Sequence, residues 1–257
     1  MPEGDTIHYA ARHIRPALVG RVPEVLTPQP RHRQDRWPQR LTGRRLASVD
    51  VHGKHLLLRF DGGLTLHSHL RMSGAWGVYG RGQRWRRSAR RAWLILRTPA
   101  WEVVQFDGPV LELMTDARSR SDHRLSALGP DVLGVELDHR LVLARLRQDD
   151  PTRPIGDALL DQRTVAGLGN VWKAEACFAA GLDPWRPAGE VSDAEALAAV
   201  EAARRGMVVS AREGHRRRPR RVYNRAGLPC ARCGTRIRSR GQGDENRTTY
   251  WCPGCQR

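Results

Sequence analysis

The sequence has little of several things, and each shortage excludes a class of protein. No apolar run approaches the roughly 18 residues of a membrane-spanning helix, and the N-terminus lacks the apolar core of a signal peptide. An amphipathic basic helix and a lipidation motif are also missing, which argues against a membrane partner. The 5 cysteines do not form a disulfide framework. We therefore expect a cytoplasmic protein, most simply a monomer.

Acidic residues are scarce as well. Asp and Glu total 27 against 44 Lys and Arg, which gives a net charge of +17 on 257 residues. Such an excess of positive charge on a folded chain indicates a polyanionic partner, most simply nucleic acid. In a bacterial cell it predicts association with the nucleoid. A basic membrane-surface protein is the runner-up. Lysine is rare too, because only Lys54 and Lys173 occur and every other basic residue is arginine.

Hydrophobic periodicity predicts an α+β fold. A helical pattern follows the N-terminus, and residues 21–125 then favour short strands with loops, including a basic loop at 81–91. Asp61-Gly62-Gly63 is a strong hairpin turn. We expect a β-sandwich with a helix along it. The predicted strands cover residues 46–51, 55–60, 64–70, 92–96, 102–106 and 110–114.

The second half of the chain has a helical periodicity. Pro130 is a reasonable hinge, and residues 216–221 form a basic linker. The predicted helices cover residues 137–147, 155–160, 171–180 and 193–212. The sequence thus predicts an N-terminal β-sandwich domain with a leading helix at 1–128, a helical domain at 129–220 and a zinc-ribbon finger at 221–257.

The N-terminus carries a candidate nucleophile. Removal of Met1 before the small Pro2 leaves a secondary amine, and a terminal amine has a reference pKa of about 7.7–8, against about 10.4 for lysine. More of it is therefore unprotonated at neutral pH, which is the form that attacks carbon. Glu3 follows directly, and Asp5 is a plausible N-cap for a helix whose positive end would face both residues. A frayed terminus is the alternative that five residues alone would favour.

Four cysteines match a structural zinc site. Two Cys-x2-Cys pairs separated by 18 residues form the pattern of a four-cysteine ribbon, and we expect one structural Zn²⁺. The ligands are Cys230, Cys233, Cys252 and Cys255. Arginines between the pairs, Arg247 among them, suit a hairpin tip that lies beside a phosphate backbone. Cys177 stands apart and is most simply a buried core thiol.

Two further segments are candidate phosphate sites. Residues 161–170 end one helix, turn through two glycines and place Asn170 to cap the next, where exposed N–H groups can bind phosphate. A plain helix–turn–helix corner is an equally good interpretation. Lys54 precedes an apolar strand, and its compact ammonium suits a phosphate or a reaction centre, although a surface lysine is the simpler interpretation. His67 and His69 alternate on a strand and are expected to be half-buried or to face DNA.

These segments, in this order, resemble the formamidopyrimidine-DNA glycosylase and endonuclease VIII family of base-excision repair. The resemblance extends from one end of the chain to the other, and the combination of motifs is very specific. The family fold joins a β-sandwich domain to a helical domain with a helix–two-turns–helix motif and a zinc finger. The matching motifs are Pro2-Glu3-Gly4, Gly53-Lys54, Gly167-Leu168-Gly169-Asn170, Val222-Tyr223-x-Arg225-x-Gly227-x-Pro229-Cys230 and Arg247-x-x-Tyr250-Trp251-Cys252-Pro253-x-Cys255-Gln256.

The resemblance implies a bifunctional DNA glycosylase and abasic-site lyase acting on damaged DNA. Pro2 is then the nucleophile that attacks C1′, Glu3 the general acid/base at the sugar oxygen, and Lys54 a catalytic phosphate contact. Base flipping leaves a hole in the stack that an apolar side chain commonly fills. The DNA-binding residues implied are Asn170 and Arg247 at the phosphates, Met72 as the wedge with Arg71 beside it, and Arg225.

The resemblance is less specific about which damaged base is excised. The start Met-Pro-Glu-Gly-Asp-Thr is like endonuclease VIII, and residues 105–112 lack the Arg-x-Phe-Gly loop of the 8-oxoguanine branch, so oxidised pyrimidines are the expected substrates. Two departures concern lesion range: Asn224 replaces a usual glycine, and Ser73 stands where endonuclease VIII has a tyrosine. The alternatives are an 8-oxoguanine- or formamidopyrimidine-preferring glycosylase, a non-catalytic DNA-binding relative and a zinc-ribbon RNA-binding protein.

Overall fold

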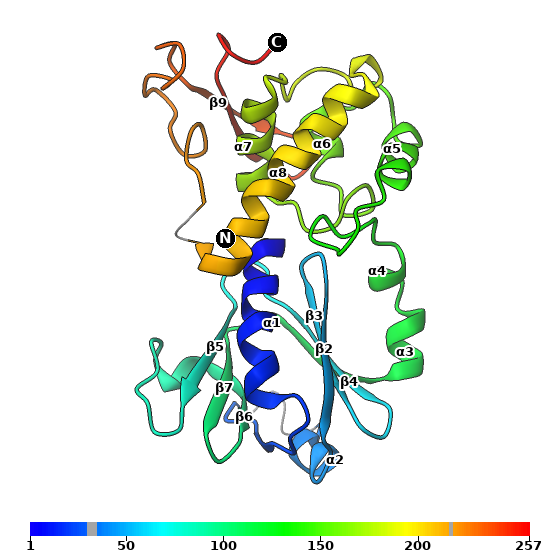
Figure 1. Cartoon of the computed structure of the whole chain (residues 1–257), viewed down its shortest axis with the longest axis vertical. Coiled ribbons are helices and arrows are strands. Elements are labelled where there is room, and N and C mark those ends of the chain that lie inside the picture. The colour runs from blue at the N-terminus through cyan, green and yellow to red at the C-terminus, as the bar shows by residue number, and fades with distance from the viewer. Residues whose placement is uncertain (30–34, 216–217) are drawn as a thin grey trace. The chain divides into compact units, whose positions relative to one another are not determined.

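The computed structural model describes residues 1–29, 35–215 and 218–257 (Figure 1). The chain separates into two compact units, one of residues 1–2 and 6–126 and the other of residues 3–5 and 127–257. Of the predicted basic linker, residues 216 and 217 lie outside the described residues. Within the described part of the chain, none of the helices has the length and apolar character that crossing a membrane requires.

Two antiparallel four-stranded sheets make up most of the first unit. One has the strand order β2-β3-β4-β8 and the other β1-β6-β7-β5. Gly62 and Gly63 adopt positive φ angles of 79° and 73° in the turn between β3 and β4, as the predicted hairpin requires. The strands are β1 (Glu24–Leu26), β2 (Leu46–His52), β3 (His55–Phe60), β4 (Leu64–His69), β5 (Ala75–Gly80), β6 (Ala92–Arg97), β7 (Trp101–Phe106) and β8 (Val110–Thr115).

Helix α1 (Gly4–Leu18) supplies one face of the first core. Ile7, Ile14 and Leu18 are buried at helical spacing and join one apolar cluster with residues of both sheets, such as Leu58 and Leu96. This confirms the predicted sandwich with a helix along it. The shorter helices of the unit are α2 (Trp37–Leu41), α3 (Asp116–Ser121) and α4 (His123–Ser126).

A second apolar cluster lies on the β6–β7–β5 strands. Tyr79, Ile95 and Phe106 are buried there, and Trp85 packs against them from the basic loop. The loop ends in the 3-10 turn η2 (Ala89–Arg91). The exposed loop predicted at 81–91 is therefore confirmed, and Trp85 anchors it to the sheet.

The helices of the second unit pack around a buried apolar cluster that includes Trp172, Leu168 and Val200. Ser192 begins the longest helix with a capping box, in which its side chain and that of Glu195 bond each other's backbone N–H. The elements are α5 (His139–Arg147), α6 (Ile155–Ala158), α7 (Asn170–Ala180), η3 (Ala188–Glu190) and α8 (Asp193–Glu213).

The hairpin of β9 (Arg238–Gln242) and β10 (Arg247–Trp251) completes the second unit. Its apolar contacts are with α7, because Ala174 and Phe178 share a buried cluster with Ile237 and Cys252. A β-sandwich, a helical part and a four-cysteine finger confirm the predicted α+β fold class.

Candidate active site

The Glu3 carboxylate binds the N-terminus of α7. Oε1 accepts a hydrogen bond from the Val171 N–H at 2.9 Å and Oε2 one from the Trp172 N–H at 3.3 Å. The Glu3 side chain is fully buried. A Cβ on Gly169 would overlap the Glu3 carboxyl group, so only glycine leaves room for it. The positive end of α7, and not that of α1 as predicted, therefore holds this carboxylate.

Two neighbours of Glu3 strengthen the attachment. The Gly4 N–H donates to the Gly167 carbonyl at 2.9 Å. Asp5 is fully buried and pairs with the almost equally buried Arg218, whose Nε donates to Asp5 Oδ2 at 2.7 Å, and Ser210 donates to the same carboxylate. Asp5 lies inside α1, which begins at Gly4, so the predicted N-cap role is wrong. Its burial is stabilised by the Arg218 charge.

Asn170 contacts the hairpin instead of capping α7. The N-cap is Gly169, and Asn170 is the first helical residue, so the predicted capping role is wrong. Its Nδ2 donates to the Thr248 carbonyl at 2.7 Å. We predicted that the N–H groups at this helix start are exposed and can bind phosphate. That prediction is wrong for Val171 and Trp172, whose N–H groups donate to Glu3. Asn170 thus ties α7 to the strand that carries Arg247.

Arg247 stands at the first residue of β10 and is paired with an acid. Its guanidinium bonds the Glu245 carboxylate, with Nε to Oε2 at 2.6 Å, and the Arg247 side chain is 41% exposed. The hairpin tip, residues 243–246, contains Asp244 and Glu245 and no arginine, contrary to the predicted arginine-bearing tip. A phosphate that binds Arg247 has to compete with Glu245.

Lys173 is a functional candidate that the sequence pattern did not reveal. It is fully buried on α7, and Nζ donates to Gln242 Oε1 at 3.0 Å and to Thr249 Oγ1 at 2.5 Å. Burial lowers the pKa of Lys173 to about 8, with Cys177 and Asp157 opposing the shift. The only available signal was the rarity of lysine in this chain. Lys173 and Asn170 together attach both strands of the hairpin to α7.

Glu175 fixes the segment that leads into the finger. Its buried carboxylate accepts hydrogen bonds from the backbone N–H groups of Arg221, Val222 and Tyr223 at 2.8–3.0 Å. Just beyond, Asn224 has a φ of 58°, in the left-handed region that glycine favours. Asparagine tolerates this region better than most residues, so it can stand where the resembled family usually has glycine. Arg225 follows it half-buried. Sequence reasoning missed Glu175 because its partners lie 46 to 48 residues away.

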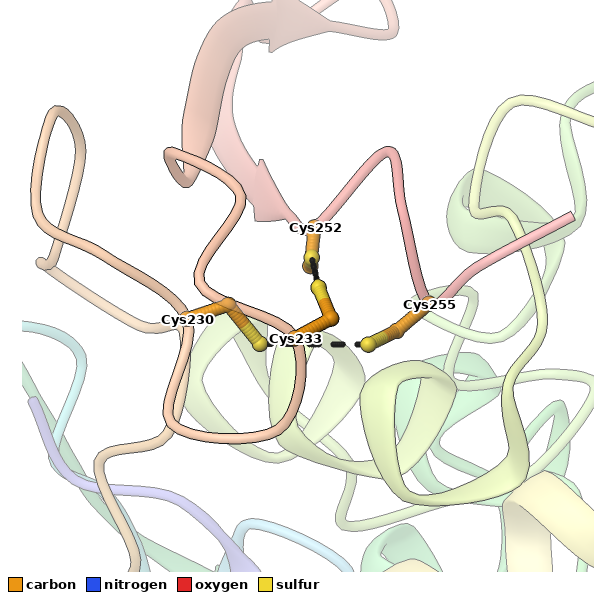
Figure 2. A group of neighbouring side chains, drawn as sticks. All are labelled: Cys230, Cys233, Cys252 and Cys255. Carbon is orange, nitrogen blue, oxygen red and sulfur yellow. Dashed lines mark hydrogen bonds between the residues drawn. The ribbon is translucent and has the colours of Figure 1, made fainter.

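The four finger cysteines come together as predicted (Figure 2). Their sulfur atoms all lie within 4.8 Å of one another, with Cys230 to Cys255 at 3.8 Å and Cys233 to Cys252 at 3.5 Å. Such a group could hold a metal ion. Cys177 is buried in the helical core, where burial raises the pKa of its thiol to about 12, so its predicted structural role agrees with its surroundings.

Lys54 lies in the turn between β2 and β3, after Gly53 with a φ of 57°. Three histidines gather on the adjacent strands. His55 Nδ1 and His67 Nε2 are 2.8 Å apart, and the His69 ring lies edge-on to His55 at 4.8 Å. Burial, followed by the charges of Arg71 and Lys54, lowers the pKa of His69 to about 4. His67 is buried, so the predicted half-buried or DNA-facing position is wrong for it.

The loop after β4 presents the predicted wedge. Met72 is 66% exposed, so its apolar side chain is accessible from solvent. Arg71 beside it has a φ of 48° in the left-handed region. Arg87 of the basic loop donates to the Ser73 carbonyl at 2.9 Å and to Asp107 at 3.2 Å. The wedge loop is therefore held by a side chain from a separate segment.

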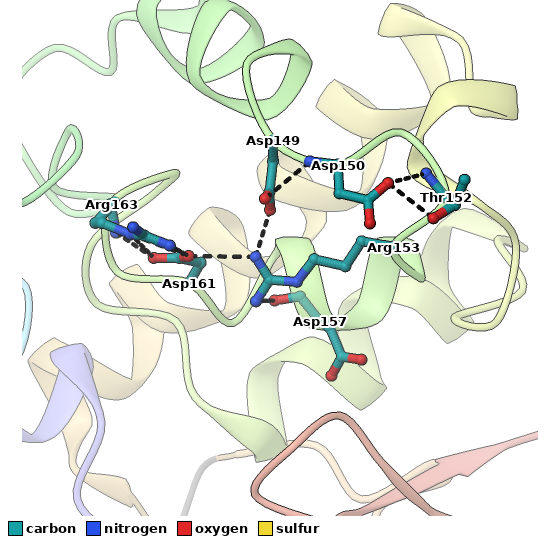
Figure 3. A network of polar contacts seen from close by, with 7 residues as sticks. All are labelled: Asp149, Asp150, Thr152, Arg153, Asp157, Asp161 and Arg163. Carbon is teal, nitrogen blue, oxygen red and sulfur yellow. Dashed lines mark hydrogen bonds and ion pairs between the residues drawn. The ribbon is translucent and has the colours of Figure 1, made fainter.

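A network of charges holds the predicted two-turn segment at 161–170 (Figure 3). Arg153 bonds both Asp149 and Asp161, and Asp161 also bonds Arg163 at 2.6 Å. Burial acts to raise the pKa of Asp161, but hydrogen bonds from Arg163 and Arg153 outweigh it and bring the pKa to about 2. Gln162 then bonds the Leu168 carbonyl at 2.9 Å. These contacts fix the turn that leads into α7.

Comparisons with known proteins identify the family to which the chain belongs. Residues 1–120 match the model of the formamidopyrimidine-DNA glycosylase N-terminal domain, and residues 128–216 match the formamidopyrimidine-DNA glycosylase H2TH domain. The chain belongs to the formamidopyrimidine-DNA glycosylase and endonuclease VIII family, as its motifs predicted, on the endonuclease VIII side.

Relatives match over the whole chain. "Probable endonuclease 8 2" of Streptomyces coelicolor is 45% identical and covers 100% of this chain, with 94% of that protein matched. The "DNA-(apurinic or apyrimidinic site) lyase Nei2" of Mycolicibacterium smegmatis is 36% identical over 100% of this chain and 99% of its own length. The fold matches that of Lactococcus lactis Fpg in complex with N7-benzyl-Fapy-dG DNA, with a TM-score of 0.83, 22% identity and full coverage of both chains.

Proposed function

We propose that the protein is a bifunctional DNA glycosylase and abasic-site lyase that excises oxidised bases through an N-terminal proline Schiff base. The observation that carries the proposal is the Glu3 carboxylate, buried and held by two backbone N–H groups of α7, directly after Pro2 in the chain. A fully buried acid fixed by backbone donors is suited to proton transfer at a defined atom. The relatives named as endonuclease 8 and abasic-site lyase support this assignment.

The chemistry follows from the two residues. The Glu3 carboxylate takes one proton from the Pro2 ammonium, and the neutral amine then attacks C1′. The bond between C1′ and the damaged base breaks, and the base leaves with the electron pair and the proton that the Pro2 nitrogen still carries. As the sugar ring opens, Glu3 passes its proton to the ring oxygen. The resulting iminium is positively charged, which acidifies the 2′ proton. Loss of that proton expels the 3′ phosphate by β-elimination, and a second, δ-elimination expels the 5′ phosphate.

The remaining predicted residues bind the DNA. Asn170 and Arg247 are connected through Thr248, next to Arg247, which supports their assignment to phosphates around the lesion. Lys54 contacts phosphate near the reacting sugar, and the exposed Met72 fills the space left by the flipped nucleotide. Arg71 and Arg225 are further DNA contacts. Damaged DNA is the partner, and flipping costs about a few kcal/mol, least for damaged bases.

The metal is one structural Zn²⁺. Zinc–thiolate bonds of about 2.3 Å in a tetrahedron place sulfur atoms about 3.8 Å apart. The separations of 3.5 and 3.8 Å between opposite cysteine pairs fit that arrangement. A bound ion would hold the ends of the β9–β10 hairpin together and so support Arg247. We assign residues 1–128 to the catalytic domain, residues 129–220 to the helical domain and residues 221–257 to the zinc finger.

The preferred substrates are oxidised pyrimidines. The loop after β7 is short, and Asp107 within it bonds Arg87 and Arg91, so the Arg-x-Phe-Gly side chains of the 8-oxoguanine branch have no counterpart there. The full-length relatives named endonuclease 8 support the same branch.

Borohydride trapping tests the mechanism. Wild-type protein, mixed with an abasic duplex and borohydride, should form a stable covalent adduct whose protein peptide begins at Pro2. A variant with one extra residue before Pro2 should form no adduct and cut no strand. An adduct on that blocked variant would overturn the Pro2 assignment and make Lys54 the next candidate.

A lesion panel tests the substrate. Duplexes with dihydrothymine, thymine glycol, 8-oxoguanine or a formamidopyrimidine are compared at equal enzyme concentration under single turnover. Faster excision of the two pyrimidines supports the proposal. Faster excision of 8-oxoguanine, with trapping intact, would leave the mechanism standing and overturn only the base preference.

A further inference from the structure

The basic loop between β5 and β6 concentrates positive charge that its own unit does not neutralise. Residues 81–91 contain six arginines and no acid. Arg87 and Arg91 pair with Asp107, at 3.2 and 2.6 Å. Within residues 1–29, 35–215 and 218–257, no carboxylate pairs with the remaining four, which are all exposed. These are Arg81, Arg84, Arg86 and Arg90.

The loop is fixed to the sheet beneath it. Trp85 donates from Nε1 to Glu102 Oε2 at 3.0 Å and lies edge-on to Phe106 at 5.8 Å. The Arg86 N–H donates to the Tyr79 hydroxyl at 3.3 Å. Gln29 also binds this segment, through the Arg90 carbonyl at 2.6 Å. A run of charged residues that only faces solvent needs no such anchoring. A binding surface gains affinity from it, because a loop that is already fixed loses less conformational entropy on binding.

The same loop is connected to the wedge loop. Arg87 donates to the Ser73 carbonyl at 2.9 Å, and Ser73 directly follows the exposed Met72. Arg87 also bonds Asp107, so one guanidinium joins the wedge loop, the basic loop and the turn after β7. A duplex whose stack receives Met72 therefore runs past residues 81–91, and the part of a duplex that any neighbouring surface meets first is its phosphate backbone.

We propose that residues 81–91 form a second DNA-binding surface, in which Arg81, Arg84, Arg86 and Arg90 contact backbone phosphates away from the lesion. This inference rests on the proposed function and adds a site to it. The groove along the loop has a volume of about 730 Å³, and Arg84, Arg86 and Arg87 are among the residues that line it. Its one acid, Glu102, is bonded to Trp85 and Arg97. Its contacts are to phosphate and independent of base sequence, so they add affinity and salt dependence without changing lesion choice.

The test is the salt dependence of DNA binding. Each phosphate contact contributes about 0.9 to the slope of log K against log salt on B-DNA. Changing Arg81, Arg84, Arg86 and Arg90 to Gln should therefore flatten the slope by about 3 to 4 on a long duplex with a non-cleavable abasic analogue. Between about 50 and about 200 mM salt, the variant should then lose on the order of 100-fold less affinity than wild type. On a duplex cut back to the lesion and its nearest neighbours, the two slopes should converge.

A matched variant controls for net charge. Arg12, Arg40, Arg118 and Arg120 are exposed arginines of the same unit without a recorded carboxylate partner in its described part. Changing these four to Gln removes the same charge and should leave the slope within about one unit of wild type. Melting temperature and zinc content establish that both variants are folded.

The outcomes separate this inference from the proposed function. If the loop variant binds the long duplex with the wild-type slope, or if the control variant flattens it equally, the second surface does not exist. Borohydride trapping on the same abasic duplex reports on the proposed function independently. If wild-type protein forms the borohydride adduct but the loop variant keeps the wild-type salt slope, only the second DNA-binding surface is overturned. If wild-type protein forms no adduct, the proposed glycosylase and lyase function is overturned.

Discussion

Glu3 and Val171 are 168 residues apart in sequence, yet the Val171 backbone N–H donates to the Glu3 carboxylate at 2.9 Å. The proposed acid/base is therefore positioned by main-chain atoms of α7. Main-chain donors hold a carboxylate more rigidly than long side chains do, because they have no rotamers to lose. The arrangement depends on Gly169, whose missing Cβ leaves the space that the Glu3 carboxyl group fills.

Gly169→Ala should therefore damage base excision more than abasic-site cleavage. The added Cβ displaces the Glu3 carboxyl group, and loss of one acid/base group costs about 10²–10⁴ in rate. A preformed abasic site already offers an open-chain aldehyde, so the step that Glu3 assists is largely complete there. Glu3→Gln should give the same pattern.

The measurement is single-turnover cleavage of a thymine-glycol duplex and of an abasic duplex. Gly80→Ala is a suitable control, because its nearest non-neighbouring atom would be Gln83 Oε1 at 3.9 Å. Equal loss on both substrates in Gly169→Ala and Glu3→Gln would contradict the division of roles between Pro2 and Glu3.

The contribution of Arg247 to DNA binding should depend on the neighbouring carboxylate of Glu245. Because Glu245 bonds its guanidinium, Glu245→Gln removes a competitor of phosphate and should tighten DNA binding. Arg247→Ala should weaken binding for all sequences and flatten the salt slope by about one unit. Titration of fluorescent duplexes at several salt concentrations measures both effects. Glu136→Gln, an exposed acid elsewhere in the same unit, removes the same charge and should change little.

Either of two results would count against this picture. An Arg247→Ala effect confined to one lesion type would mark Arg247 as a base reader. Equal tightening by Glu245→Gln and Glu136→Gln would show that net charge, and not the release of Arg247, is responsible.

Removal of the metal should loosen the hairpin. The four sulfur atoms lie within 4.8 Å, and without an ion thiolates at that distance repel one another. Chelation should release one zinc per chain, increase proteolysis between Arg238 and Trp251, and weaken DNA binding through Arg247. Metal analysis, limited proteolysis and binding are the measurements. Protein that binds DNA at full affinity with no zinc present would contradict the finger assignment.

Local patterns predicted most of the fold, since strands, helices and the cysteine pairs are signalled by residues close in sequence. The Asp61-Gly62-Gly63 turn, whose two glycines adopt positive φ angles, is an example. Composition also indicated that residues 81–91 would be an exposed loop. It gave no hint that Trp85 would be packed against the sheet.

Polar contacts between distant segments were not predictable from the same patterns. Asn170 looked like a helix cap because asparagine commonly caps helices, but tertiary packing places it against Thr248, 78 residues later. Glu3 and Asp5 looked like parts of the first helix start, and both are bound by residues of the second unit's helices and linker. Which donors meet a buried carboxylate is decided by the packing of helices and not by sequence spacing.

Lys173 leads to a prediction of pH-dependent stability. Burial lowers its pKa from 10.5 to about 8 in the folded protein, whereas the unfolded chain keeps the ordinary value. Between about pH 8 and 10.5 the unfolded state therefore binds more protons than the folded state, and stability contributed by this group rises with pH across that window. The contribution is on the order of 3 kcal/mol over the whole window.

The experiment compares wild type with Lys173→Met, in which the side chain keeps its length but loses the proton. Urea unfolding of the zinc-loaded protein is followed from neutral pH to about pH 10.5, and the difference between the two stability curves isolates Lys173 from other titrating groups. The wild-type curve should rise relative to the Met curve above about pH 8. Lys173→Arg, which stays charged throughout, should show no such rise and should instead be destabilised by an ion that burial cannot neutralise. Parallel wild-type and Met curves would contradict the prediction, because they would mean that the bonds to Gln242 and Thr249 fully offset the cost of burying the Lys173 ammonium.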